Sequence, residues 1–385
     1  MKHIGQSKRA AYAVIAALLL VVSACGDDAP EEDETATTVA ETPGDATTTE
    51  SEAEEEPVQV KFATVSAITS FPAFVALEGG FWLDENIEAE ITTLDSGSAV
   101  AQGLAAGEFD AGSANMSLST PVARHEGTPI KSIVATGANP FGIGFAARMG
   151  VIARTASGID PADPATWAGK KAGATTGTSP EQFLIKYIAS LGVPDGSVEI
   201  LNVPATDQQT ALQQGIVDVV IATDPYVLRI TNAMGADATL LQRGGAFTSD
   251  ILTQVVLDDY IEESPDVIER LVRGLVRATL FMKESPAEAG ELVTGYVDGL
   301  TVEEAVDAIE QQTNDPRLSV CVEEDVLRAQ QQLIEDGVME RPEPFPFEEL
   351  FDREFLDTVL EEEEFVTAMA DFPPLPTDVT ECEGY

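Results

Sequence analysis

Residues 173–182 combine small hydroxyl side chains with the start of a helix, a combination that can bind an anion. Ser179, Pro180 and Gln182 predict an N-cap, a first-turn proline and a capping-box partner. The free N–H groups of such a helix start can hold an oxyanion without a charged side chain, and a glycine such as Gly177 lets a ligand approach the backbone. An ordinary capped helix is the alternative, so the rest of the chain must decide between them.

A second helix start has the same chemistry. The order Asp95, Ser96, Gly97 and Ser98 predicts a cap, followed by a helix through Leu104. Residues 58–65 alternate as in a strand, 66–72 leave that strand as a loop, and 88–94 form another strand. These elements indicate an α/β fold.

An internal repeat supports two similar α/β lobes. Leu104, Gly107 and Asp110 recur 108 residues later as Leu212, Gly215 and Asp218. Each copy is expected to form a helix, a glycine stop and a strand. The strands then end in polar residues, at 115–119 and at 223–226.

Strand ends and helix starts share the carboxyl edge of an open α/β sheet, where ligands bind. Five polar segments should therefore converge, although each one alone is better explained as a turn or a cap. The candidate ligand-binding residues, including two from the loop at 139–141, are Ser66, Thr69, Ser70, Phe71, Ser96, Gly97, Ser98, Asn115, Met116, Ser117, Asn139, Phe141, Thr176, Gly177, Thr178, Ser179, Asp224 and Tyr226.

The N-terminus carries an export pattern. Lys2, Lys8 and Arg9 precede an apolar run at 10–24 that is too short to span a bilayer as a mature helix. Small residues before Cys25 resemble a bacterial lipobox, so residues 1–24 are interpreted as a lipoprotein signal peptide and Cys25 as the lipidated mature N-terminus. Simple secretion with a free thiol is the alternative.

Acidic residues dominate the following segment, 25–57, which has almost no large apolar side chain and is expected to be a disordered tether. The remaining chain is longer than one hydrophobic core usually supports, so two lobes are expected. The net charge of −46 argues against binding to nucleic acid or anionic lipid by electrostatics.

An ordered series of motifs resembles the substrate-binding proteins of ABC importers for nitrate, sulfonates, taurine and thiamine precursors (SsuA/THI5-like, NMT1-like). The resemblance covers nearly all of residues 58–361. The motifs lie at 71–82, 106–110, 127–130, 157–159, 167–171 and 176–179.

The resemblance implies a type II periplasmic-binding-protein fold, with two α/β lobes joined by two hinge crossings and a helical C-terminal region. The first lobe would comprise 58–149 and 254–385, the second 150–253, with crossings near 147–151 and 252–256. It also implies an ABC permease with its cytoplasmic ATPase as partner and a monomeric state. The lipobox adds a lipid-anchored position on the outer face of the cytoplasmic membrane. The family commonly has an aromatic residue at the position of Thr223 or Asp224, so the stacking contact expected there is in doubt.

The ligand expected from these residues is a small organic anion of the sulfonate, taurine or nitrate class. Asp224, Tyr226, Phe71 and Phe141 would also suit an amine or flat heterocycle, so an aminopyrimidine thiamine precursor is the alternative. No metal or cofactor is expected. A cell-surface sensor domain would use the same fold without an importer.

Enzyme functions are disfavoured. His125 is the only histidine after the signal, which argues against zinc chemistry or a Ser-His-Asp triad. The motif G-x-G-x-x-A at 142–147 precedes an expected strand rather than a helix, unlike a dinucleotide site. A THI5-like pyrimidine synthase remains a rival, but it would need Lys and His at its cofactor.

The C-terminal region should contain helices beginning at Ser264, Ser285 and Thr301. Glu361 to Glu364 are expected on a solvated helix face. Cys321 and Cys382 are predicted to form a disulfide, because export places them in an oxidising compartment. Two unpaired thiols are the alternative.

Overall fold

A computed structural model describes residues 56–142, 148–245, 247–297, 299–310 and 312–383. The predicted signal peptide, Cys25, nearly all of the tether and most of the glycine motif at 142–147 lie outside these residues. Within the described ranges, no helix has both the length and the apolar character needed to cross a membrane.

The first lobe is built on a five-stranded mixed sheet in the order β2-β1-β3-β10-β4. Strand β1 runs parallel to β2 and β3, whereas β10 runs antiparallel to β3 and β4. The strands are β1 (Val58–Val65), β2 (Ile87–Leu94), β3 (Ala111–Asn115), β4 (Ile130–Val134) and β10 (Leu252–Leu257).

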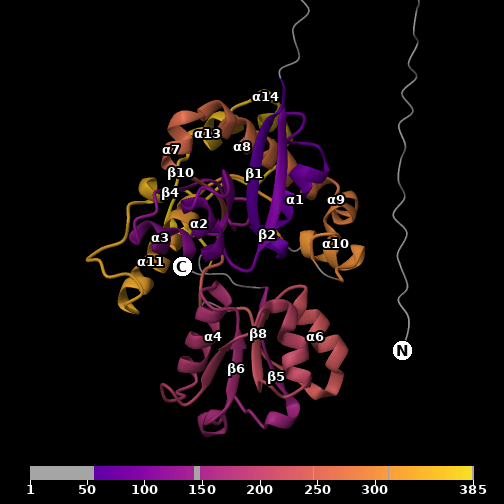
Figure 1. Ribbon diagram of the computed structural model, residues 1–385, viewed down its shortest axis with the longest axis vertical. Coiled ribbons are helices and arrows are strands. Elements are labelled where there is room, and N and C mark those ends of the chain that lie inside the picture. The colour runs from indigo at the N-terminus through magenta and orange to yellow at the C-terminus, as the bar shows by residue number, and fades with distance from the viewer. Residues whose placement is uncertain (1–55, 143–147, 246, 298, 311, 384–385) are drawn as a thin grey trace, which may run out of the picture. The chain divides into compact units, whose positions relative to one another are not determined.

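A second five-stranded sheet, in the order β7-β6-β8-β5-β9, forms the other lobe. Here β6 runs parallel to β7 and β8, and β5 runs antiparallel to β8 and β9. Helices α4 (Ser179–Ser190) and α6 (Tyr226–Met234) flank this sheet (Figure 1). The strands are β5 (Met149–Arg154), β6 (Lys171–Ala174), β7 (Glu199–Asn202), β8 (Val219–Thr223) and β9 (Ala238–Arg243).

The internal repeat has the same structural role in both lobes. The carboxylate of Asp110 accepts a hydrogen bond from the N–H of Lys61 (2.7 Å), and that of Asp218 accepts one from Lys171 (3.1 Å). Each aspartate N–H in turn donates to the carbonyl of the same lysine. The two aspartates therefore fix the start of a parallel strand pair in the same way.

The return crossing lies earlier in the chain than the sequence predicted. Residues 252–256 belong to β10, a central strand of the first sheet, so the chain returns to the first lobe before Leu252. The first crossing was predicted near 147–151, where β5 of the second sheet begins at Met149.

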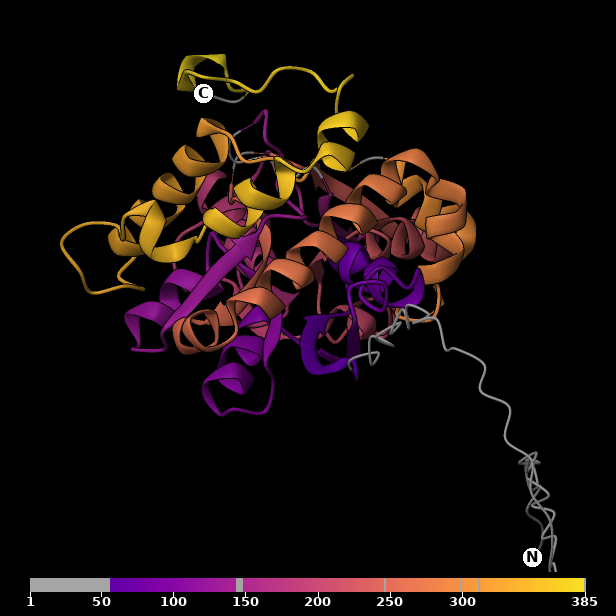
Figure 2. The same ribbon diagram turned by 90° about the horizontal axis from the view of Figure 1, so that it is seen from above.

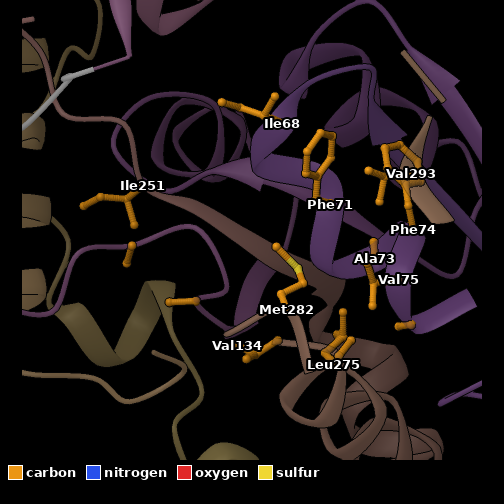
Figure 3. Close-up of a cluster of buried hydrophobic side chains, with 14 of the residues drawn as sticks. Ile68, Phe71, Ala73, Phe74, Val75, Val134, Ile251, Leu275, Met282 and Val293 are labelled. Atoms are coloured by element: carbon orange, nitrogen blue, oxygen red, sulfur yellow. The ribbon is translucent and has the colours of Figure 1, made fainter. Parts of the chain in front are cut away.

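Helices from both ends of the chain cover the first lobe (Figures 1 and 2). Long helix α8 packs on α1, so that Phe71 and Phe74 lie in one buried cluster with Leu275 and Met282 (Figure 3). The helices of this lobe are α1 (Phe71–Glu78), α2 (Gly97–Ala105), α3 (Ser119–His125), α7 (Asp258–Glu263), α8 (Pro265–Glu284), α9 (Pro286–Val293), α10 (Val302–Glu310), α11 (Val320–Glu335), α12 (Phe347–Leu350), α13 (Glu354–Leu360) and α14 (Glu363–Ala368).

Three details of the helical region differ from or match the local predictions. Thr301 and Glu304 form the predicted reciprocal capping box of α10, but Ser285 makes no side-chain cap. The run at 361–364 is not one solvated face, because α13 ends before it and α14 begins within it. Glu362 and Glu364 instead pair with Arg273 and Arg277 of α8.

Candidate functional site

A cavity of about 200 Å³ lies between the two sheets, and all five polar segments contribute to its wall. Its apolar surface includes Leu118, Met149 and Leu252. The predicted ligand residues that line it are Ser66, Thr69, Ser96, Gly97, Asn115, Gly177, Thr178, Ser179, Asp224 and Tyr226.

Helix α2 points its N-terminus at the cavity. Ser96 is its N-cap, with an extended backbone and a side chain that accepts the N–H of Ala99 (3.2 Å). The N–H groups of Gly97 and Ser98 belong to the first turn and have no partner within the helix. No acidic residue lies in this first turn, so the helix dipole favours an anion here.

Helix α4 begins one residue earlier than predicted. Thr178 is the N-cap and its hydroxyl accepts the N–H of Glu181, whereas Ser179 is already helical. The cap partner is therefore Glu181 and not Gln182. The Glu181 carboxylate accepts the N–H of Gly177 at 2.7 Å, where a φ of 74° favours glycine.

The anion-binding potential of α4 is consequently reduced. Glu181 places a negative charge at the helix start and takes one N–H, and the N–H of Thr176 donates to the side chain of Asn202 (3.0 Å). Thr176 is exposed and does not line the cavity. The sequence could not show these internal acceptors, because Asn202 is distant in the chain.

Asn115 lines the cavity, but the protein itself satisfies its amide. The Nδ2 group donates to Ser179 Oγ (2.8 Å) in the second lobe and to Asp250 Oδ1 (3.0 Å), and Oδ1 accepts the N–H of Ser117 (2.8 Å). All of the usual donors of this amide are used. Asn115 therefore positions Asp250 and joins the lobes.

Several predicted ligand residues lie behind the wall. Phe71 and Met116 are fully buried in the first-lobe core, and α1 begins at Phe71, so the last two residues of the loop expected at 66–72 are helical. The hydroxyl of Ser70 accepts a hydrogen bond from that of Thr64, and the hydroxyl of Ser117 donates one to Asn115 Oδ1. The hydroxyl of Ser98 donates to the carbonyl of Gly177 (3.3 Å), which joins the two helix starts directly.

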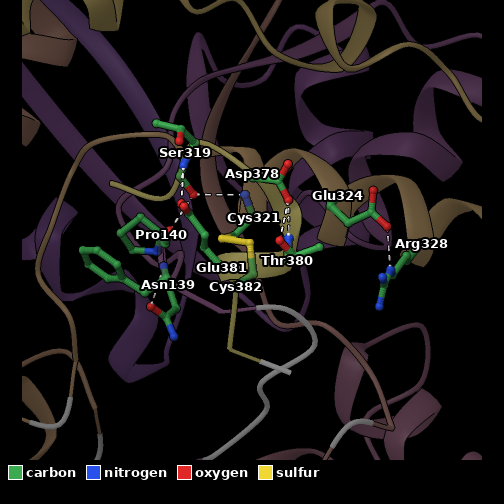
Figure 4. Close-up of a disulfide and its surroundings, with 12 residues drawn as sticks. Asn139, Pro140, Ser319, Cys321, Glu324, Arg328, Asp378, Thr380, Glu381 and Cys382 are labelled. Carbon is green, nitrogen blue, oxygen red and sulfur yellow. Dashed lines mark hydrogen bonds and ion pairs between the residues drawn. A yellow bond between two sulfur atoms is a disulfide. The ribbon is translucent and has the colours of Figure 1, made fainter. Parts of the chain in front are cut away.

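Asn139 lies near the disulfide between Cys321 and Cys382 (Figure 4), and neither Asn139 nor Phe141 lines the cavity. The carbonyl of Phe141 accepts the N–H of Glu383 (2.8 Å). These two residues therefore contact the C-terminal tail.

Two carboxylates with arginine partners complete the wall. Asp224 is 6% exposed and accepts hydrogen bonds from Arg243, whose Nη1 lies 3.1 Å from Oδ1. Asp250 pairs with Arg148 at 3.9 Å, and both side chains are 15% exposed. Burial raises the pKa of Asp250, although Arg148 and Asn115 oppose it, and burial lowers the pKa of Arg148 against the effect of Asp250 and Asp224.

Sequence reasoning missed Asp250, Met149 and Leu252. They begin or precede strands β5 and β10, which run antiparallel to their neighbours. The amino end of an antiparallel strand lies at the carboxyl edge of the parallel strands beside it. A charged residue before the apolar run at 251–257 was the available signal.

Arg229–Glu304 and Lys186–Asp336 are ion pairs that join the two lobes. Arg229 of α6 lies 3.4 Å from Glu304 of α10, and Lys186 of α4 lies 3.8 Å from Asp336 after α11. The Arg229 guanidinium also lies 5.4 Å from the centre of the Tyr226 ring, which lines the cavity. Of these two ion pairs, only Arg229–Glu304 includes a residue that contacts the cavity wall.

The family model described as NMT1/THI5 like matches residues 68–289, more than half of the chain. This segment contains every lining residue of the cavity except Val65, Ser66 and Ala67. No curated protein sequence matches the chain.

Solved structures show the same fold at low sequence identity. A protein from Bordetella bronchiseptica RB50 superposes with a TM-score of 0.65 at 19% identity, covering 80% of this chain and 98% of its own. The alkanesulfonate-binding protein SsuA from Xanthomonas axonopodis pv. citri, bound to MOPS, superposes with a TM-score of 0.64 at 15% identity, covering 78% of this chain and 99% of its own. The periplasmic nitrate-binding protein NrtA from Synechocystis PCC 6803 superposes with a TM-score of 0.64 at 13% identity, covering 84% of this chain and 92% of its own. The predicted two-lobed periplasmic-binding-protein fold is confirmed.

Proposed function

Because the chain belongs to the NMT1/THI5-like family, we propose that it is the extracytoplasmic solute-binding component of an ABC importer. It binds a small organic anion of the sulfonate or taurine class between its lobes and delivers it to a permease. The observation that carries the proposal is the cavity between two helix N-termini, one from each lobe.

The anionic head binds mainly to α2. The first-turn N–H groups of Gly97 and Ser98 face a site without a first-turn acid, whereas Glu181 already occupies α4. The Ser179 hydroxyl, which accepts a hydrogen bond from Asn115, supplies a further polar contact. Apolar side chains such as Leu118 cover the carbon chain of the ligand.

Binding and closure are coupled in this mechanism. Ser98 bonds to Gly177, and Asn115 bonds to Ser179, across the two lobes. A ligand that contacts both helix starts binds the closed state better than the open one, and this difference in affinity shifts the equilibrium toward closure. The permease then recognises the closed state.

Anchoring completes the proposed role. Lipidated Cys25 holds the protein at the outer face of the cytoplasmic membrane, and the acidic segment up to residue 57 spaces the lobes from it. Membrane fractionation of cells checks this point. The Cys25→Ser variant should leave the membrane fraction, and retention of that variant in the membrane would contradict the anchor.

Thermal melting with a ligand panel tests the binding role. Ligand at about one hundred times its dissociation constant adds roughly 2.7 kcal/mol of stability, which shifts the melting midpoint measurably. We expect a shift with a sulfonate, and a weaker one for Gly97→Pro, which removes an N–H from the start of α2. A shift with aminopyrimidines alone would favour the thiamine-precursor alternative, which Asp224 and Tyr226 in the wall support. No shift with any solute would contradict the proposal.

A further inference from the structure

The charged side chains in the described wall of the cavity all carry a negative charge. They are Asp95, Asp224 and Asp250, and no Lys, Arg or His is among the lining residues that the structure describes. Asp95 is exposed, while Asp224 and Asp250 are largely covered. A simple anion would gain nothing from these two groups.

Asp250 has unused capacity to accept hydrogen bonds. A carboxylate offers about four acceptor positions. Asp250 accepts one hydrogen bond from Asn115, and its Arg148 partner stays at 3.9 Å, beyond hydrogen-bond distance. Asp250 is among the residues that line the cavity.

Asp224 supplies a second carboxylate from a different segment. Both of its oxygens accept hydrogen bonds from Arg243, which does not itself line the cavity. Each carboxylate oxygen can accept more than one hydrogen bond. The two arginines offset the cost of burying the acids. Tyr226, close by in sequence and in the same wall, offers a ring face that also favours a cation.

We propose that the ligand is a zwitterion whose protonated amine binds Asp250 and Asp224 while its anionic head binds the start of α2. This inference rests on the proposed binding function and narrows its ligand class. Asn115 is the positioning residue, because its amide holds Asp250 through Nδ2 while bonding to Ser179 of the other lobe. The amine thus binds near the residues that connect the lobes.

Matched pairs of solutes, measured by isothermal titration calorimetry on the purified protein, test the proposal. The zwitterions are taurine, 2-aminoethylphosphonate and β-alanine, and their amine-free partners are ethanesulfonate, ethylphosphonate and propionate. We expect at least one zwitterion to bind about tenfold or more tightly than its partner, because charge-assisted hydrogen bonds to a covered carboxylate are lost without the amine.

Variants locate the amine. Asp250→Asn should weaken the zwitterion about tenfold without weakening the amine-free anion, because it removes a negative charge from the wall, with melting used to confirm folding. Asp224→Asn tests the same claim if the first variant does not fold. Asp259→Asn, an exposed acid of α7 outside the cavity lining, is the matched control and should have no effect.

The outcomes separate the two proposals. Equal binding of zwitterion and amine-free anion would overturn the zwitterion inference but leave the proposed function standing. Binding of bare ethylamine or an aminopyrimidine alone would support the carboxylate subsite and contradict the anionic head. Failure of every solute would overturn both.

Discussion

The two lobes use one αβ scaffold for different tasks. Asp110 and Asp218 hold equivalent strand starts, yet β3 ends in an amide that the protein satisfies, while β8 leads into the Asp224 carboxylate. The helix starts differ in the same sense, since α2 leaves its first turn open and α4 fills its own with Glu181. The repeated αβ unit thus gives both lobes the same backbone arrangement. A few positions that differ between the repeats give the two lobes different charged and polar groups at the cavity.

The disulfide gives the largest expected difference between the lobes. It links α11 to the C-terminal tail on the first lobe and closes a loop with a sequence separation of 61. The Cys321→Ser, Cys382→Ser variant should destabilise the first lobe by about 3–4 kcal/mol through the entropy of the unfolded chain. Each lobe has one buried tryptophan, Trp82 or Trp167, so fluorescence of Trp167→Phe and Trp82→Phe backgrounds follows each lobe in denaturant.

Equal destabilisation of both tryptophan signals would show that the lobes unfold as one unit and would remove this contrast. Thiol labelling of the denatured, unreduced protein is the control. Labelling of both Cys321 and Cys382 would contradict the disulfide itself.

Acid should weaken zwitterion binding more than anion binding. Burial raises the pKa of Asp250 against the opposing effects of Arg148 and Asn115, so this acid is protonated at a higher pH than an ordinary aspartate. Below its pKa, affinity for the zwitterion should fall by up to about tenfold in total, because only the ionised acid accepts the ammonium. Titration calorimetry from pH 7 to pH 4 measures this decline.

The folding stability of the ligand-free protein should change with pH in the opposite direction to zwitterion affinity. A raised acid pKa contributes stability that is present below the unfolded value and is lost as pH rises through the folded value. Asp250→Asn should remove both effects. A zwitterion affinity that stays constant with pH would contradict a role for Asp250.

The two interlobe ion pairs should differ in their effect on binding. Arg229→Gln is expected to lower ligand affinity about three- to tenfold, because it removes both the Glu304 pair and the contact with Tyr226. Lys186→Gln removes only the pair with Asp336 and should change affinity less than about twofold. Calorimetry of both variants makes the comparison, and equal losses would mean that the cavity wall plays no part in closure.

The smallest expected effect concerns the two helix starts. Glu181→Gln keeps an acceptor for the N–H of Gly177 but removes the negative charge. Affinity for an anionic head should rise about two- to fivefold, as expected for one charge near a helix N-terminus. Glu199→Gln, on the exposed strand β7, is the control with no expected change. A loss of affinity in Glu181→Gln would show that Glu181 itself binds the ligand.

Local signals determined much of this molecule from the sequence alone. Strand β1 follows from alternating side chains, the cap of α2 from Ser96, and the box of α10 from Thr301 and Glu304. The repeat and the motif series predicted two lobes and the family, because they depend on order along the chain. Such features need no knowledge of distant contacts.

Tertiary structure decided which polar groups remain available to a ligand. Asn115 was predicted at the site, but only the fold shows that Ser179, Ser117 and Asp250 satisfy its amide. Phe71 lies in the core because α8 packs against its helix. Asp250 reaches the wall because β10 returns antiparallel to β3. Hydrogen-bond partners and burial join residues far apart in the chain, so they are fixed only when the chain has folded.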